Sequence, residues 1–250
     1  MAIKSFKRWE KKFLLSKEQY EKLLPRLLAY MNQDEYCSLG KNYNIYNIYF
    51  DTKDNDVIRH STAKPYYKEK LRLRSYVVPK NPSDTVFLEL KKKIGGVVNK
   101  RRVVMTLEEC NKFLSLGVRP EREDFITNQV LNEIEYYLSR NTVIPSVYIS
   151  YSRKAFFGKD NKDFRITFDS NILTRRTELY LEKGSFGKEL LEKNQYLMEV
   201  KILGSMPLWL AHAFSELKIY STSFSKYGNE FEKYSFNATN INKVRRENIC

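Results

Sequence analysis

The sequence has little of the chemistry used for covalent catalysis or for disulfide-stabilised folds. Its 250 residues contain three cysteines, Cys37, Cys110 and Cys250, which are widely spaced and include no Cys-x-x-Cys pair. We therefore expect neither a disulfide framework nor a zinc site, and a reducing cytoplasm is the predicted location. The two histidines, His60 and His212, lie in no recognisable motif, so we assign them surface or core roles.

Long apolar runs are also missing. The N-terminal residues are charged and contain no apolar signal core, and no stretch of about 18 apolar residues occurs. The sequence thus predicts neither a secretion signal nor a transmembrane helix. No Pro-, Gly- or Ser-rich linker and no internal repeat divides the chain. We expect one domain over residues 1–236, followed by a polar, basic and poorly ordered tail over residues 237–250.

Acidic residues are scarce relative to basic ones, with 30 Asp and Glu against 44 Lys and Arg and a formal net charge of +14. Such a balance predicts an anionic partner, which could be nucleic acid, a membrane surface or a phosphate-rich small molecule. The net charge alone does not choose among these three.

Strand-like segments dominate what is present, and the 18 tyrosines and 15 phenylalanines favour strands. Two capping boxes, Ser16 with Gln19 and Thr106 with Glu109, predict helix starts, and Pro25 is expected to kink or end the first helix. Further helices are expected over residues 122–139 and 207–219. The predicted strands cover residues 8–15, 43–51, 68–78, 85–94, 97–105, 146–155, 164–169 and 196–203. This order predicts an antiparallel β-rich domain with helices outside, or an α+β fold.

Charged residues alternate with apolar ones along most of these strands. Lys70-Leu71-Arg72-Leu73-Arg74 is the clearest case. Because successive side chains of a strand point to opposite faces, Arg72 and Arg74 share one face and the leucines share the other. The remaining charged positions with this pattern are Arg8, Glu10, Lys12, Glu89, Lys91, Lys93, Lys100, Arg102, Arg153, Arg165, Asp169, Glu199 and Lys201, with Ser225 and Lys226 after a short loop.

These faces are either solvated, which is the usual fate of charges, or they form one polyanion-binding surface. Two like charges about 7 Å apart repel by roughly 2 kcal/mol at an effective dielectric constant of 20, so a shared lining would need anions. Arginine offers a planar fork for phosphate oxygens, and lysine offers a point charge. Glu89 could pair with a neighbouring lysine, whereas Glu199 could hold Mg²⁺ or Mn²⁺.

Taken in order, these motifs resemble the triphosphate tunnel metalloenzyme (CYTH-like) superfamily, and more closely the bacterial form of the vacuolar transporter chaperone (VTC) polyphosphate polymerase domain. The resemblance covers about residues 8–235. The matching motifs are Glu10-Lys11-Lys12, Tyr49-Phe50-Asp51-Thr52, Lys70-Leu71-Arg72-Leu73-Arg74, Phe87-Leu88-Glu89-Leu90-Lys91, Lys100-Arg101-Arg102, Tyr151-Ser152-Arg153-Lys154-Ala155-Phe156, Arg165-Ile166-Thr167-Phe168-Asp169, Met198-Glu199-Val200-Lys201 and Phe224-Ser225-Lys226-Tyr227.

The resemblance implies an eight-stranded antiparallel β-barrel that forms a basic tunnel, with helices packed outside. It implies transfer of the terminal phosphoryl group of ATP onto polyphosphate, with Mn²⁺ or Mg²⁺ bound by Glu199. It also allows for a membrane-protein partner that this chain does not encode. The implied catalytic residues are Lys12, Arg72, Arg74, Lys91, Arg153, Arg165 and Lys201. The implied substrate-binding residues are Glu10, Glu89, Lys93, Lys100, Arg102, Ser225 and Lys226.

Two positions depart from the family pattern. Arg8 stands where the hydrolase branch has the first Glu of Glu-x-Glu-x-Lys, which favours the polymerase branch over a two-metal triphosphatase. Ser223 stands where polymerases often carry a further lysine. The alternatives are an inorganic triphosphatase or nucleoside triphosphatase of the same fold, and a non-catalytic module that binds polyphosphate or inositol phosphates. Nucleic acid is not the expected partner, because no recognition motif of the known modules occurs.

Overall fold

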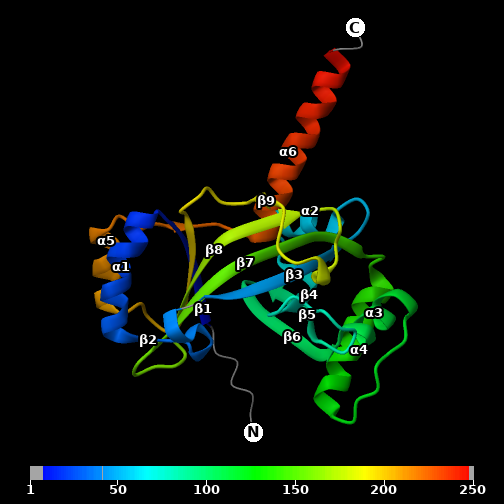
Figure 1. The fold of residues 1–250 in the computed structure, drawn as a ribbon, viewed down its shortest axis with the longest axis horizontal. Helices are drawn as coiled ribbons and strands as arrows, with labels where there is room; N and C mark the ends of the chain where they lie inside the picture. Colours follow the sequence, from blue (N-terminus) through cyan, green and yellow to red (C-terminus); the bar gives the residue numbers. More distant parts are fainter. Residues whose placement is uncertain (1–7, 41, 248–250) are drawn as a thin grey trace. The chain divides into compact units, whose positions relative to one another are not determined.

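The computed structural model describes residues 8–40 and 42–247, and it has an α+β fold in which helices pack on an antiparallel sheet (Figure 1). The strands are β1 (Arg8–Leu15), β2 (Met31–Gln33), β3 (Tyr43–Asp51), β4 (Tyr67–Ser75), β5 (Thr85–Ile94), β6 (Val97–Thr106), β7 (Ile144–Gly158), β8 (Arg165–Arg175), β9 (Lys188–Glu189), β10 (Tyr196–Leu203) and β11 (Ser221–Thr222). The α-helices are α1 (Lys17–Tyr30), α2 (Asp56–Thr62), α3 (Leu107–Leu116), α4 (Phe125–Arg140), α5 (Leu208–Glu216) and α6 (Lys226–Glu247), with short 3₁₀ helices at Glu35–Gly40 and Leu181–Lys183.

The strands hydrogen-bond in the order β11-β1-β10-β8-β7-β3-β4-β5-β6, with β2 paired to β7 and β9 paired to β8. With β2 and β9, the sheet has eleven strands in the described part of the chain instead of the expected eight, and the order of the other nine ends at β11 and β6 without closing. The α+β class is therefore confirmed, and the closed eight-stranded barrel is not.

The described residues group into two compact units. The first takes its residues from Met1–Tyr46, Ser150–Leu173 and Leu191–Phe224, and the second from Asn47–Ile149, Thr174–Leu190 and Ser225–Cys250. Strands β3, β7 and β8 each contribute residues to both units. The expectation of one domain over residues 1–236 stays a prediction.

In the first unit, α1 and α5 cover one face of the sheet (Figure 1). Alternation along β1, β10 and β8 places every second side chain in the core beneath these helices. The buried core residues are Phe13 and Leu15 from β1, Met198, Val200 and Ile202 from β10, Ile166 and Phe168 from β8, Leu23 and Leu27 from α1, and Leu210, Ala213 and Phe214 from α5. The charged side chains of the same strands therefore point to the other face.

In the second unit, β4, β5 and β6 form an antiparallel meander against which α3 and α4 pack. The β5–β6 turn uses Gly95 and Gly96, whose φ angles of +52° and +90° suit glycine and match a tight hairpin. Leu71 and Leu73 of β4, Leu88 and Leu90 of β5, and Val103 and Met105 of β6 are buried. The intervening charged residues lie on the opposite face of the meander.

Several sequence-based expectations are corrected by the local structure. Helix α1 does not end at Pro25 but continues to Tyr30, because Leu23 and Leu27 anchor it in the core while Pro25 stays on the exposed side. Residues 56–62 form helix α2, which the sequence analysis did not predict. Helix α6 continues to Glu247, and the poor order expected over residues 237–250 stays a prediction, with residues 248–250 outside the description. Among the described helices, none has the length and apolar character needed to cross a membrane.

Candidate functional site

The first unit holds a group of charged residues that we call the Glu199 cluster: Glu10, Lys12, Arg153, Arg165, Asp169, Glu199 and Lys201. Strand register brings them together. Lys12 of β1 pairs with Glu199 of β10, which pairs with Thr167 of β8. The neighbouring row is Glu10, Lys201 and Arg165. Directly opposed side chains of antiparallel strands point to the same face about 5 Å apart, so both rows present one continuous charged surface.

Two lysines and two carboxylates alternate at the centre of this cluster. The Lys12 Nζ atom lies 3.6 Å from Glu199 Oε1 and 3.8 Å from Glu10 Oε1. The Lys201 Nζ atom lies 3.6 Å from Glu10 Oε2 and 3.8 Å from Glu199 Oε2. These distances fit ion pairs and are too long for good hydrogen bonds. Lys12 Nζ also donates to the Phe224 carbonyl at 2.9 Å, which orients it beside Glu199.

Arg153 is held differently, by a bidentate contact with a buried carboxylate. Its Nε and Nη2 atoms donate to Asp169 Oδ1 and Oδ2 at 2.6 and 2.8 Å, and Asp169 is fully buried. Burial opposes the charge of Arg153, but Asp169 outweighs this and raises the pKa of the guanidinium well above its usual value. Because Asp169 already neutralises it, Arg153 contributes less net charge to the face than its type suggests.

Arg165 lies at the end of the other row, with its guanidinium 4.8 Å from the ring centre of Phe157. Its Nη2 atom is 3.7 Å from Asp34 Oδ2 and donates to the Tyr43 hydroxyl at 3.4 Å. Its Nε atom is buried without a hydrogen-bond partner in the described structure. Arg165 is thus packed in place while one of its donors remains unsatisfied.

The Glu199 cluster fits a divalent metal that arrives with phosphates. In the described part of the chain, no group of three or more His, Cys, Asp or Glu side chains could hold a metal ion alone. Mg²⁺ keeps waters and substrate phosphates in its shell and needs only one or two protein carboxylates, which Glu199 and Glu10 supply. The hydroxyl of Thr167, opposite Glu199 in the register, is buried with no partner in the described structure. This donor set suits an open, oxygen-rich ion site.

The second unit holds a more strongly cationic group, which we call the Glu89 cluster: Arg72, Arg74, Glu89, Lys91, Lys93, Lys100 and Arg102. Here Glu89 of β5 lies between Arg72 of β4 and Arg102 of β6 in one row. The Nε atoms of the two arginines donate to Glu89 Oε2 and Oε1 at 2.6 and 2.7 Å. Lys91 pairs with Lys100 in the next row, and Lys93 lies further along the same face.

Positive charge exceeds negative charge around Glu89, and this excess contributes to the lowered pKa values of Glu89 and Lys100. Burial would raise the pKa of the fully buried Glu89 carboxyl, but Arg72, Arg74, Lys100 and Arg102 outweigh burial and hold the pKa far below its usual range. The pKa of Lys100 is lowered by burial and by the neighbouring arginines, against the pull of Glu89. The face is therefore short of anions.

Two aromatic hydroxyls border the Glu89 cluster. Tyr49 accepts a hydrogen bond from Arg72 Nη1 at 3.1 Å, and Tyr76 accepts one from Arg102 Nη2 at 3.1 Å. Burial opposes ionisation of Tyr49, yet Arg72, Arg74 and Lys226 lower the pKa of its phenol to about 8. Asn47 accepts from Arg74 Nε at 2.9 Å and donates to the Ile149 carbonyl at 2.9 Å, which fixes Arg74 to β3.

Ser225 and Lys226 lie where α6 begins, in the second unit. Ser225 Oγ accepts from the Gly228 amide at 3.1 Å, as a helix-capping side chain does, and Lys226 is buried. The next residue, Tyr227, donates from its hydroxyl to Asp51 Oδ2 at 2.6 Å. Asp51 also accepts from the amides of Val57 and Ile58, so one buried carboxylate joins β3, α2 and α6.

The structure thus divides the fifteen predicted site residues between the two units, six in the first and nine in the second. Their roles in catalysis and binding stay predictions, and the side chain of Arg8 lies outside the description. Sequence reasoning missed Thr167, Tyr49 and Asn47. Thr167 lies on a strand with predicted charges, and Tyr49 and Asn47 lie on β3, where none were predicted, so their uncharged side chains drew no attention.

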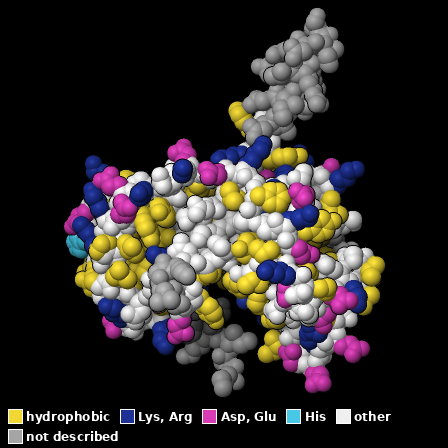
Figure 2. All heavy atoms as spheres, in the orientation of Figure 1, with side chains coloured by type: hydrophobic (Ala, Val, Ile, Leu, Met, Phe, Trp, Pro, Cys, Tyr) yellow, Lys and Arg dark blue, Asp and Glu magenta, His cyan; other side chains and the backbone are white. Residues whose placement is uncertain are grey.

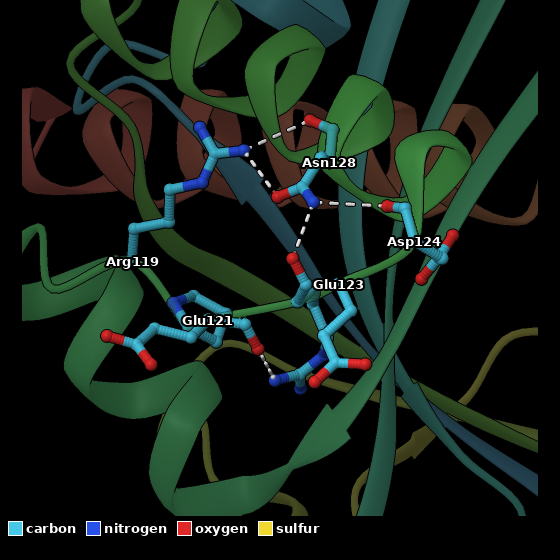
Figure 3. Close-up of a pocket in the computed structure, with 7 residues that line it drawn as sticks. Arg119, Glu121, Glu123, Asp124 and Asn128 are labelled. Atoms are coloured by element: carbon cyan, nitrogen blue, oxygen red, sulfur yellow. Dashed lines mark hydrogen bonds between the residues drawn. The ribbon is translucent and has the colours of Figure 1, made fainter.

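A cavity of about 970 Å³ lies elsewhere, where the chain passes from α3 to α4. Figure 3 shows its lining, in which Arg119 Nη2 donates to Asn128 and the Asn128 amide donates to the Arg122 and Asp124 carbonyls. In Figure 2, acidic side chains gather over this α3–α4 region. Because its polar groups satisfy one another and its charge is mixed, the cavity does not suit a polyanion. None of the predicted site residues lines it.

Comparison with known structures gives the same class of fold. A proposed adenylate cyclase from Bacillus halodurans is 16% identical, with a TM-score of 0.51 over 86% of this chain and 92% of that one. A second proposed adenylate cyclase, from Vibrio parahaemolyticus, is 13% identical with a TM-score of 0.44, covering 90% and 97% of the two chains. The PH1819 protein from Pyrococcus horikoshii is 14% identical with a TM-score of 0.45, covering 91% and 99%. At 16% identity, the similarity to the Bacillus halodurans protein shows a shared fold and does not show a shared activity.

No curated protein matches the sequence. The profile of the VTC domain family does, over residues 7–234. The matched residues begin just before β1 and end within α6. They therefore include both the Glu199 cluster and the Glu89 cluster. The strand faces described above are therefore features of a recognised domain, and the chain belongs to the VTC domain family.

Proposed function

We propose that this protein is a metal-dependent polyphosphate polymerase that transfers the terminal phosphoryl group of ATP onto a polyphosphate chain. The family and the fold support a function related to polyphosphate or nucleotides. The observation that carries the finer proposal is the shortage of anions on the Glu89 cluster, together with the Glu199 carboxylate between two lysines. Together these features suit a phosphate chain and the metal ion that accompanies it.

The proposed reaction asks mainly for positioning and charge neutralisation. The bond between the γ-phosphorus and the β,γ-bridging oxygen breaks, and its electron pair stays on ADP. A terminal oxygen of the acceptor chain forms the new P–O bond. In this proposal Arg72, Arg102 and Lys100, which surround Glu89, would bind phosphate oxygens, and Lys12 and Lys201 would balance charge beside Glu199. The divalent ion, Mn²⁺ or Mg²⁺, would neutralise charge on the transferring phosphates. No nucleophilic side chain is needed.

The closed eight-stranded tunnel belongs to this proposal. Substitutions in each unit test whether each cluster contributes to the reaction. Arg102→Gln in the second unit and Lys201→Gln in the first should each lower the yield of long chains. Lys22→Gln, a change at an exposed lysine paired with Glu18, serves as the control and should leave the yield unchanged.

The decisive experiment incubates the purified chain with ATP and Mn²⁺ and resolves the products on a polyacrylamide gel. A ladder of polyphosphate with matching ADP release is expected, and Glu199→Gln should abolish it. Release of only ADP and orthophosphate would refute the polymerase proposal. Tight binding of polyphosphate without turnover, unaffected by Glu199→Gln, would identify a binding module instead.

A triphosphatase is the second candidate, and one observation favours it. Glu10 shares both Lys12 and Lys201 with Glu199, so two carboxylates are available on this face despite Arg8 in the first motif position. If hydrolysis is the activity, Glu10→Gln should reduce orthophosphate release from inorganic triphosphate as strongly as Glu199→Gln does. For a polymerase that relies on Glu199 as its metal ligand, Glu10→Gln should have the smaller effect.

A further inference from the structure

Thr167 carries a buried hydroxyl that makes no hydrogen bond to the part of the chain that the structure describes. Its side chain is 3% exposed, and Oγ1 is buried without a hydrogen-bond partner in the described structure. It lies on β8 between Arg165 and Asp169, on the charged face of the strand. Its neighbours on the opposite face, Ile166 and Phe168, belong to the core. Thr167 is therefore turned toward the Glu199 cluster and away from the apolar interior.

An unpaired buried hydroxyl destabilises a protein by about 1–3 kcal/mol, whereas valine has nearly the same shape and no polar atom to satisfy. Valine also has a high preference for strands. For folding alone, valine would be the better residue at position 167. Nearby on the same strand face, the Nε atom of Arg165 is also buried without a partner. Two unsatisfied donors on one face indicate that an acceptor from outside the chain completes them.

The position of Thr167 in the sheet indicates what that acceptor is. Thr167 is the third member of the row formed by Lys12 and Glu199, and it pairs directly with Glu199. The adjacent row supplies Lys201 and Arg165. An acceptor that lies among ammonium and guanidinium groups is an anion, and one that also lies beside a carboxylate needs a cation to join them. A phosphoryl oxygen of a metal-bound phosphate meets both conditions.

We propose that Thr167 is a further ligand-binding residue of the Glu199 cluster, and that its hydroxyl donates a hydrogen bond to a phosphoryl oxygen of the metal–phosphate complex. This inference rests on the proposed function, because it assumes that the cluster binds phosphates. It predicts an unusual combination: removal of the hydroxyl stabilises the free protein and weakens ligand binding. If Thr167 had a purely structural role, removing the hydroxyl would lower both the stability and the ligand affinity, or would change neither.

The test compares Thr167→Val with Thr167→Ser, which retains the hydroxyl, and with Thr167→Ala as a second deletion of it. Inorganic tripolyphosphate is titrated calorimetrically into each protein, with and without Mn²⁺, and thermal unfolding is measured without ligand. Thr167→Val should bind about 10-fold more weakly in the presence of Mn²⁺, since a hydrogen bond to a charged group is lost. Its Tm without ligand should rise by about 2–4 °C. Thr167→Ser should bind within about twofold of wild type.

The outcomes separate this inference from the proposed function. If wild type does not bind tripolyphosphate, the proposed function fails and the inference falls with it. If wild type binds and Thr167→Val and Thr167→Ala bind equally well, only the inference is wrong. An equal loss with and without Mn²⁺ would show that the hydroxyl binds phosphate independently of the metal ion, and a loss confined to the titration without Mn²⁺ would overturn the inference. A lower Tm for Thr167→Val with unchanged binding would assign a structural role.

Discussion

Replacing Glu89 with Gln removes the carboxylate at the centre of the Arg72–Glu89–Arg102 row. The side chain is fully buried and its two oxygens each accept from a different arginine, at 2.6 and 2.7 Å. Lys100 Nζ lies 3.5 Å from the same carboxylate. Glutamine keeps the size of the side chain and one acceptor oxygen, but its amide group turns a donor toward a guanidinium. The substitution therefore leaves at least three cations without their shared counter-ion.

The expected loss of stability is several kcal/mol. One pair of unit charges 4 Å apart attracts by about 4 kcal/mol at an effective dielectric constant of 20, and Glu89 has two arginines in direct contact. The desolvation of a buried carboxylate offsets part of this attraction. Removing one partner of a buried ion pair destabilises proteins by about 3–5 kcal/mol, and we expect Glu89→Gln to fall in this range.

The loss should depend on pH in one direction. The pKa of Glu89 is lowered in the folded protein, against an unfolded value of about 4.3 for a glutamate. Its stabilising contribution is therefore fully present above the unfolded pKa and is lost as the pH falls toward the folded pKa. The difference in unfolding free energy between wild type and Glu89→Gln should be constant at neutral pH and shrink below about pH 4.

Equilibrium urea unfolding, followed by circular dichroism at pH 7 and at a series of acidic pH values, measures this difference. Glu18→Gln is the matched control, because Glu18 pairs with Lys22 on an exposed helix surface and its loss should leave the midpoint unchanged. Tripolyphosphate should restore part of the stability of Glu89→Gln by neutralising the exposed cations. A destabilisation below about 1 kcal/mol at pH 7 would refute the reasoning, since it would place the pair among weak surface contacts.

Three further outcomes follow from the same structure. The phenol of Tyr49 should ionise with a pKa of about 8 in an ultraviolet titration. Tripolyphosphate should raise that pKa by neutralising the surrounding cations. If the low-pKa transition persists in Tyr49→Phe, it does not belong to Tyr49. Asp169→Asn should destabilise the protein by about 3–5 kcal/mol in urea unfolding, because the 12% exposed Arg153 would lose its bidentate partner; an unchanged midpoint would show that this pair is not buried in solution. Thr106→Ala breaks the capping box with Glu109 and should cost about 1 kcal/mol by the same measurement, with Thr106→Ser near wild type; equal losses for both variants would rule out the cap.

Local patterns predicted much of the fold. The capping boxes at Ser16 and Thr106 begin helices where expected, and strands β1, β5 and β10 have the predicted bounds. These features depend on residues a few positions apart, so the sequence contains the information needed. Strands β7 and β8 extend beyond the predicted ranges because pairing with neighbouring strands, and not local composition, sets where a strand ends.

The start of α6 is a second element that local sequence patterns could not predict. Its sequence, from Lys226 onward, is polar and has weak helical periodicity, so no helix was predicted there. The helix is anchored by contacts between distant residues: Tyr227 donates to Asp51, and Glu230 accepts two hydrogen bonds from Arg176 at 2.7 and 2.8 Å. No window along the chain contains these partners, so no local reading could have found them.

Which side chains share a face could be predicted from the sequence, because alternation along a strand follows from backbone geometry alone. That rule identified the charged residues of both clusters and predicted a polyanion as the partner. Which charges neutralise one another could be seen only in the folded chain, since this depends on register between strands far apart in the sequence. In the structure Asp169 pairs with Arg153, Glu89 pairs with two arginines, and Glu199 lies between two lysines. The buried hydroxyl of Thr167 has no hydrogen-bond partner among the described residues.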